Sequence, residues 1–296
     1  MKTALFIALG VVTVSFVLFW ISAARKRGLH AVRPSPFDAG IGFFTNFLDT
    51  LGIGSFATTS SIFKLRRLVP DEQIPGTMNV GHALPTVAEA FIYIALVQVD
   101  LVTLVAMIAA SCAGAWFGAG TVSRWPRRTV QIGMGLALIG AAGFMLLSQL
   151  QWIPGGGVAL GVSGVKLGLA IAGNFMLGAL MTLGIGLFAP CMILVAMLGM
   201  NPTVAFPIMM GSCAFLMPTG SVRFVRENSY NLKSALGLTI GGIPGVLIAA
   251  YIVKSLPLYA VKWLVIFVVL YTAAMMLRSA MEERAAAAAA VPSTGD

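Results

Sequence analysis

The sequence predicts an all-α polytopic membrane protein with about seven full transmembrane helices plus two re-entrant helical hairpins, arranged as two inverted-topology repeats. Three observations predict this architecture: long apolar runs with few charges, a sequence motif that recurs after a fixed interval, and basic clusters between the runs. Of the 296 residues, 58% are hydrophobic and 10% are charged, whereas a soluble domain has about 25% charged residues. A chain of this composition is expected to have the lipid bilayer as its solvent.

Nine apolar runs approach or reach the length of about 20 residues that a helix needs to cross a bilayer. They cover residues 3–22, 39–63, 76–98, 101–120, 130–148, 168–199, 204–222, 234–253 and 259–277. No soluble domain separates them. We therefore expect helices that follow one another through the membrane.

The first run has two interpretations. It fits a cleaved signal peptide, in which Ser22, Ala23 and Ala24 form the small-residue cleavage site. The charges favour a retained helix instead, because one lysine precedes the run while four basic residues lie between positions 25 and 33. We expect the helix to be retained with its N-terminus outside the cytoplasm.

A five-residue motif occurs twice in the chain. Thr-Leu-Gly-Ile-Gly stands at residues 50–54 and again at 182–186, a shift of 132 residues. Further matches occur at the same shift, and after a one-residue slip Gly114 matches Gly245. The expected units are an N-terminal transmembrane helix with a basic cytoplasmic loop (1–38), a first repeat (39–148), a periplasmic linker (149–167), a second repeat (168–278) and a disordered tail (279–296).

The basic clusters decide how the runs cross. If all nine runs simply crossed, strict alternation would place the clusters at 64–67 and 124–128 outside, against the cytoplasmic preference of Lys and Arg. The run at 168–199 has 32 residues, about 48 Å as one straight helix, which is too long for one crossing. If both motif-containing runs are re-entrant hairpins, each repeat has three crossings, the repeats are inverted and the C-terminus is cytoplasmic. Nine plain crossings are the alternative.

Several classes of function are disfavoured. The formal net charge of +9 does not indicate nucleic-acid binding, because the basic residues form short clusters between apolar runs. Cys112, Cys191 and Cys213 lie inside apolar runs without metal-ligand spacing, so we expect packing residues rather than a metal site or disulfides. The sequence contains no nucleophile elbow, P-loop or dinucleotide fingerprint. We therefore expect neither an enzyme nor a cofactor.

The two Gly-Ile-Gly turns are the first candidate site. Non-helical backbone at membrane depth is tolerated where protein buries it or a watery cavity satisfies it. A new half-helix is expected after each turn, near Ser55 and near Leu187, and two positive helix ends can bind an anion without any arginine. The expected substrate-binding residues of the turns are Thr50, Gly52, Gly54, Ser55, Thr58, Thr59, Thr182, Gly184 and Gly186. The alternative is that the glycines only allow close helix packing.

The run at 76–98 carries the second candidate site. Asn79, His82, Thr86 and Glu89 occur at intervals that place them on one helical face. Glu89 is near mid-bilayer, where an ionisable side chain is expensive, so we expect it to carry a coupling proton. His82 is expected to relay that proton or, with Asn79, to contact the substrate. An interhelical hydrogen bond without proton transfer is the alternative.

Two further features have more than one interpretation. Asp49, just before the first turn, either caps the break or binds a cation. Gly114, Gly118 and Gly120 fit a packing face within the protomer or between the protomers of a homodimer.

The glycine-rich turns, together with Gly114-Ala-Trp-Phe-Gly118, Trp125-Pro-Arg-Arg128 and Gly133-Met-Gly135, resemble the sulfite exporter TauE/SafE family of membrane permeases. The resemblance covers nearly the whole chain after residue 38. It implies transport of sulfite, sulfonates or related organosulfur anions across the bacterial inner (cell) membrane. Members of that family usually have a longer glycine run in the turn, and the site residues named above come from the two breaks.

The predicted function is therefore a secondary transporter of small sulfur-containing anions. It is expected to hold the anion at the half-helix N-termini near the midplane and to work by alternating access, with a coupling proton. A passive anion channel and a transporter of another small organic anion are the alternatives. An intramembrane enzyme or assembly factor would need a reactive cluster that the sequence lacks.

Overall fold

The computed structural model describes residues 2–26, 33–70, 73–122, 157–181 and 187–255, with separate residues inside 132–150 and 260–281. Its helices are α1 (Lys2–Lys26), α2 (Pro36–Thr50), α3 (Ser55–Arg66), α4 (Ile74–Leu96), α5 (Leu101–Val122), α7 (Gly164–Met181), α8 (Phe188–Met197), the 3₁₀ helix η3 (Pro202–Val204), α9 (Ala205–Arg226) and α10 (Leu232–Ser255). Within this part of the chain there are ten helical segments, and the β-structure is one isolated bridge between Ala159 and Met200. The predicted all-helical class is confirmed.

Four described helices are long and apolar enough to cross a membrane. They are Lys2–Lys26, Gly164–Met181, Pro202–Arg226 and Leu232–Ile252. The outward-facing side chains of these helices are apolar too; Leu18 of α1 is 65% exposed and Leu247 of α10 is 55% exposed. Such a surface is stable against lipid but not against water.

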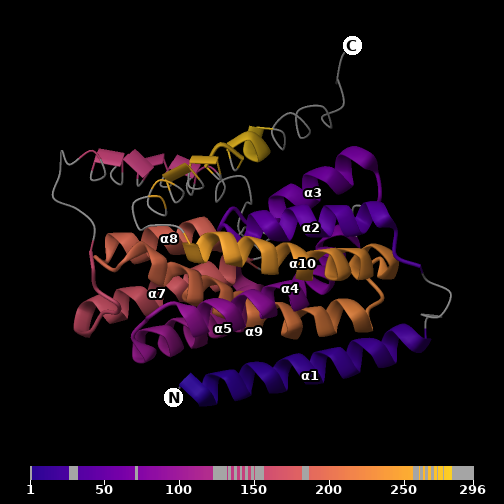
Figure 1. Cartoon of the computed structure of the whole chain (residues 1–296), viewed down its shortest axis with the longest axis horizontal. Coiled ribbons are helices and arrows are strands. Elements are labelled where there is room, and N and C mark those ends of the chain that lie inside the picture. Colours follow the sequence, from indigo (N-terminus) through magenta and orange to yellow (C-terminus); the bar gives the residue numbers. More distant parts are fainter. Residues whose placement is uncertain are drawn as a thin grey trace, which may run out of the picture.

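The helix ends gather at two opposite ends of the bundle. At the first, the Arg226 guanidinium of α9 lies 5.8 Å from the ring of Phe19 of α1, and Asn231 N donates to Thr77 Oγ1 of α4 at 2.9 Å. This end therefore holds the end of α1, the start of α4 and the end of α9, as Figure 1 shows on its right. Arginines 223 and 226 both lie in the last turn of α9.

The other end holds the loops around α5 and α7. Asp100 N donates to Leu160 O at 2.8 Å, which joins the start of α5 to the segment before α7. Lys166 Nζ donates to Leu198 O at 3.2 Å, which joins the start of α7 to the end of α8. The start of α1 lies here as well, because Lys2 Nζ reaches Ala95 O at 3.3 Å.

Helices of the first half of the chain pack against helices of the second half: α2 lies against α10, α5 lies against α7, and α4 lies against α9. Two of these contacts bring backbones together at glycine. A side chain at Gly245 of α10 would overlap the Phe43 carbonyl of α2, and one at Gly114 of α5 would overlap the Phe175 carbonyl of α7. Gly114 thus packs within the protomer, while the side-chain surroundings of Gly118 and Gly120 lie outside the described part.

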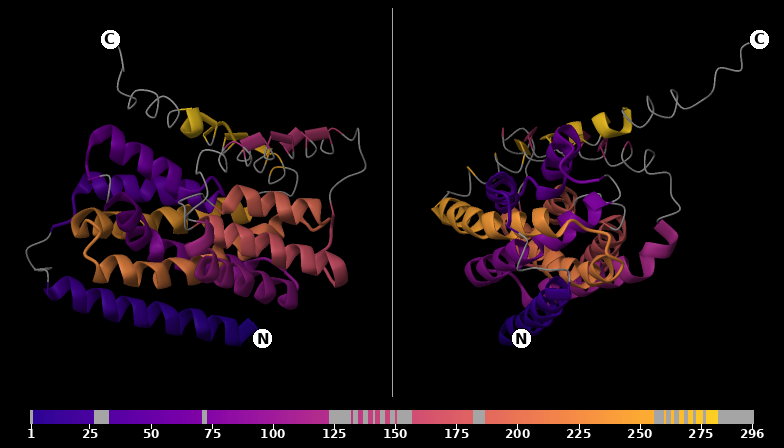
Figure 2. Two further views of the ribbon diagram at one scale, coloured as in Figure 1. Left: turned by 180° about the vertical axis from the view of Figure 1, so that it is seen from behind. Right: turned by 90° about the vertical axis from the view of Figure 1, so that its right-hand side faces the viewer.

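The peripheral segments lie on opposite edges of this bundle. Helix α1 runs along one edge in Figures 1 and 2. The described pieces of 132–150 and 260–281 lie along the other edge (Figure 2), where Gly135 packs against Leu277. The expected runs at 130–148 and 259–277 are therefore only partly described, and the expected disordered tail lies almost entirely outside the described residues.

Candidate functional site

The first predicted break lies between α2 and α3, at residues 51–54. Helix α2 ends in a glycine cap: Ile53 N donates to Leu48 O at 3.0 Å and Gly52 N to Asp49 O at 2.7 Å. Gly52 has φ +91° and Gly54 has φ +87°, a conformation that glycine adopts without steric cost. The two glycines of the motif are thus required by the backbone of the turn.

Asp49 caps the helix that follows the break. Its Oδ1 accepts a hydrogen bond from Ser55 N at 2.7 Å, at the first residue of α3. A carboxylate is stabilised there by the unpaired N–H groups and the positive end of the helix dipole. Of the two roles expected for Asp49, the structure has the cap; among the described residues no group of His, Cys, Asp and Glu could hold a metal ion.

Glu89 reaches the break from α4. Its Oε1 lies 2.8 Å from the hydroxyl of Thr50, the last residue of α2, and that hydroxyl also lies 2.8 Å from Asn46 O. One turn further along α4, the Tyr93 hydroxyl donates to Thr50 O at 2.9 Å. Two side chains of α4 therefore hold the residue at which α2 stops, and Glu89 is fully buried.

His82 joins three helices. Its Nδ1 lies 3.0 Å from Asn46 Oδ1 of α2, and its Nε2 lies 3.0 Å from the Thr59 hydroxyl of α3. Asn46 Nδ2 donates to Gly42 O at 2.7 Å, so its Oδ1 faces the imidazole and His82 Nδ1 carries the proton. In the neutral ring, Nε2 accepts from the Thr59 hydroxyl. All three side chains are fully buried.

Two buried oxygens near this network have no hydrogen-bond partner among the described residues. They are Glu89 Oε2 and Thr86 Oγ1, which lie about one turn apart on α4. An unpaired carboxylate oxygen costs far more than an unpaired hydroxyl when it is buried. Oε1 of Glu89 is thus hydrogen-bonded to Thr50, while Oε2 can accept or share a bond with a further partner.

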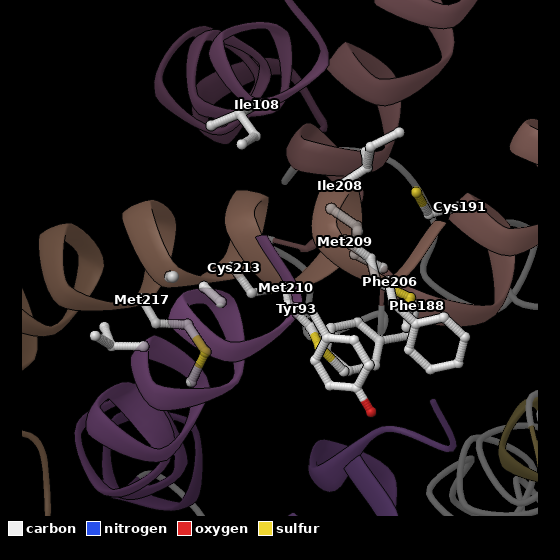
Figure 3. Packing of buried hydrophobic residues seen from close by; sticks show 14 of the residues in the cluster. Tyr93, Ile108, Phe188, Cys191, Phe206, Ile208, Met209, Met210, Cys213 and Met217 are labelled. Carbon is white, nitrogen blue, oxygen red and sulfur yellow. The ribbon is translucent and has the colours of Figure 1, made fainter. Parts of the chain in front are cut away.

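The side chains around Gly52 and Tyr93 are apolar and include two methionines. A side chain at Gly52 would overlap the Met192 methyl of α8, and Met209 of α9 lies behind it. Tyr93 stacks on Phe206 with ring centroids 5.1 Å apart, and Figure 3 shows Phe188 beside this pair. The first break therefore faces α8 and α9, which follow the second motif in the chain.

The second predicted break lies before α8. Helix α8 begins at Phe188, as expected, and its N-cap residue, Leu187, makes no side-chain capping bond. Thr182, Gly184 and Gly186 lie outside the described residues. The counterpart of Asp49 at the shift of 132 is Met181.

The remaining predicted residues are separated from this network. The Thr58 hydroxyl bonds back to Ser55 O at 2.9 Å, within α3. Asn79 is half-buried, and its Nδ2 donates to Pro75 O of its own helix at 3.0 Å. The structure thus brings Thr50, Ser55, Thr59, His82 and Glu89 together and leaves Asn79 apart.

Two site residues were missed in the sequence. Tyr93 continues the helical face of His82, Thr86 and Glu89 by one more turn, so the same spacing identifies it. Asn46 precedes Asp49 and Thr50 at helical spacing on α2. Both signals are present in the sequence as helical spacing.

A site of this kind, with ionisable side chains buried at a broken helix inside an apolar helical bundle, defines a polytopic membrane protein of the transport class. The model of the sulfite exporter TauE/SafE family matches residues 1–145 and 165–295. The chain belongs to this family, which confirms the resemblance in its motifs. It is therefore a multi-pass membrane transporter and not an enzyme. No curated protein and no solved structure matches the chain.

Proposed function

We propose that the protein moves small sulfur-containing anions, such as sulfite or organosulfonates, by alternating access coupled to a proton. Family membership implies the sulfur-anion class, and the mechanism and its coupling are inferred from the site. The observation that carries this proposal is the buried carboxyl group of Glu89, hydrogen-bonded to Thr50 where the first helix breaks. Ionisable groups in such positions are expensive and mark ion or proton pathways.

Two inverted repeats would supply the two states that alternating access needs. Phe43 and Phe175 differ by the repeat shift of 132, and Gly114 matches Gly245 after the one-residue slip. The contact of Phe43 with Gly245 therefore corresponds to that of Phe175 with Gly114. Equivalent contacts of this kind favour a pseudo-two-fold arrangement, in which the helix before each break packs against the other repeat.

The helix pairs around the breaks fit re-entrant hairpins. Arg66, at the end of α3, has its guanidinium 6.0 Å from the ring of Phe37, at the start of α2. In the second pair, Lys166 near the start of α7 bonds Leu198 O just after α8. Each pair thus starts and finishes at one end of the bundle, and the two pairs use opposite ends. We infer that the chain turns back inside the membrane at both breaks.

The hydrogen bonds of Thr50 support the proposed proton coupling. A hydroxyl donates one proton, whereas both Asn46 O and ionised Glu89 can only accept. When Glu89 is ionised, Thr50 donates to it. When Glu89 is protonated, it donates to Thr50, which then donates to Asn46 O. The same heavy-atom geometry therefore accommodates both protonation states, as a proton carrier requires.

The anion is proposed to lie between the two half-helix ends, at Ser55 of α3 and Phe188 of α8. Thr50, Thr59 and Thr182 would add hydroxyl donors, and the glycines of both turns would let the backbone approach the ligand. Thr58 and Asn79 are bonded within their own helices here, and they are proposed to contact the anion in another state of the transport cycle. His82 is proposed to position Thr59, with relay of the proton as its alternative role.

Membrane orientation follows from the basic residues. The bundle end with Arg66, Arg223 and Arg226 is proposed to be cytoplasmic. The N-terminus then lies outside, the segment 149–167 is periplasmic, and the C-terminus is cytoplasmic, in the inner membrane of a bacterium. Reporter fusions at residue 1 and residue 296 test this orientation, and a cytoplasmic N-terminus would refute it.

The function is tested by uptake of radiolabelled sulfite and ethanesulfonate into proteoliposomes, with and without a pH gradient. Saturable uptake that the gradient drives against the anion concentration supports a coupled transporter. Saturable uptake that ignores the gradient and sodium favours a uniporter or passive channel. If neither anion enters faster than into protein-free liposomes, while another organic anion does, the substrate class is wrong.

A further inference from the structure

The end of α3 that we propose for the substrate anion is already occupied by a carboxyl group of the protein. Asp49 Oδ1 lies 2.7 Å from Ser55 N, and the Asp49 side chain is 3% exposed. A carboxylate and a sulfonate are recognised in the same way by a helix N-terminus, through oxygen atoms that accept from backbone N–H groups. A substrate that binds at Ser55 must therefore replace Asp49.

The second repeat has no carboxylate at the position that matches Asp49. Leu187 provides no capping side chain for α8, and Met181 stands where the first repeat has Asp49. A cap that served only to start a half-helix would be useful at both breaks. The carboxylate at one break alone indicates a role beyond starting the helix.

Glu89 Oε1 accepts from the hydroxyl of Thr50, the residue that directly follows Asp49, and both carboxyl groups are buried. Oε2 of Glu89 is buried without a hydrogen-bond partner among the described residues. Two neighbouring carboxylates in a low-dielectric interior are stable with one negative charge between them, and a substrate anion would add a second. Arrival of the anion is thus favourable only if the pair takes up a proton.

Among the described residues, no cation forms an ion pair with Asp49. On α4, Glu89 and Tyr93 contact Thr50, the residue after Asp49, and His82 contacts Asn46, about one turn before Asp49 on α2. Helix α9 carries the buried Cys213. The described cations of α3 and α10, Arg66 and Lys233, lie near the start of α2, at Phe37 and Asp38. Asp49 is at the other end of that helix.

We propose that Asp49 is a tethered competitor of the substrate: it occupies the N-terminus of α3 in the empty transporter and, once protonated, gives up Ser55 N–H to the incoming anion. This inference rests on the proposed function. In each exchange the pair gains one proton, which enters through Glu89 and leaves Asp49 neutral. The Ser55 N–H changes its acceptor from Asp49 to a substrate oxygen, and no bond between heavy atoms changes. Anion and proton then bind together in equal number.

The test measures the affinity of the purified protein in nanodiscs for ethanesulfonate, which stays singly charged from acidic to neutral pH. The wild type is expected to bind about tenfold more weakly for each unit rise in pH, as one linked proton requires. Asp49→Asn keeps an oxygen that can accept from Ser55 N but has no charge. It is expected to bind at least about tenfold more tightly than the wild type at neutral pH, with little dependence on pH.

Asp49→Ser provides a second neutral cap in case the asparagine variant unfolds, and Asp38→Asn is the matched control. Asp38 is also a buried aspartate of α2, but it accepts from Ser234 Oγ at 3.4 Å rather than from a helix end at a break. The control is expected to behave as the wild type. The inference is overturned if folded Asp49 variants bind as weakly as the wild type, bind less tightly, or keep its pH dependence. If the wild type binds neither ethanesulfonate nor sulfite, the proposed function itself fails.

Discussion

The hydroxyl of Thr50 lies 2.8 Å from Oε1 of Glu89, so the last residue of a broken helix is bonded to a buried carboxyl group of its neighbour. Thr50 belongs to the repeated motif and Glu89 to the polar face of α4. Their contact joins the two sites that the sequence indicated separately. A change in the charge of Glu89 is thereby transmitted to the turn at which we propose that the anion binds.

Removing the Thr50 hydroxyl should weaken this junction. Thr50→Val leaves Glu89 without its hydrogen bond, and we expect a loss of about 1–3 kcal/mol in unfolding free energy. Thermal unfolding in detergent measures the change. Thr219→Val is the control, because the Thr219 hydroxyl bonds only to Phe215 O of its own exposed turn. Equal melting temperatures for the two variants would contradict the contact.

His82 is expected to act through position rather than through proton transfer. Both ring nitrogens are hydrogen-bonded in the neutral form, so His82→Gln should lower stability and the rate of uptake. The effect of the pH gradient on uptake should persist. Proteoliposome flux with the folded variant decides between the two roles, since loss of gradient dependence alone would make His82 the relay.

The close glycine contacts should tolerate no side chain. Gly114→Ala and Gly245→Ala place a methyl group against the carbonyls of Phe175 and Phe43, and we expect each to cost about 1–3 kcal/mol. The measurement is again thermal unfolding. Gly40→Ala on α2 is the matched control, because nothing lies within 4 Å of its added methyl group. If all three variants melt alike, the helices do not pack as described.

Much of this architecture could be predicted because it depends on local signals. The lengths of the apolar runs predicted the helices. The glycine pairs of the repeated motif predicted the break at residues 51–54 and the start of α8 near Leu187. The partners of the polar residues depend on tertiary packing instead. The sequence left two roles open for Asp49 because the distance to Ser55 N is fixed only by the path of the turn.

The same reason explains the residues that the sequence grouped incorrectly. Asn79 and Glu89 share a helical face, but three turns of α4 separate them, and only Glu89 reaches the break. Asn46 contributes because α2 passes within hydrogen-bonding distance of His82. The spacing within α2 places Asn46 on the face of Asp49 and Thr50, but its contact with His82 depends on how α2 packs against α4.

The central claim is that Glu89 carries the coupling proton, and uptake of ethanesulfonate by wild type and Glu89→Gln proteoliposomes tests it most directly. We expect the wild type to accumulate the anion when the pH gradient is imposed. Glu89→Gln should retain binding but lose accumulation driven by the gradient. Gradient-driven accumulation by the variant at the wild-type rate would contradict the account and remove Glu89 from the mechanism.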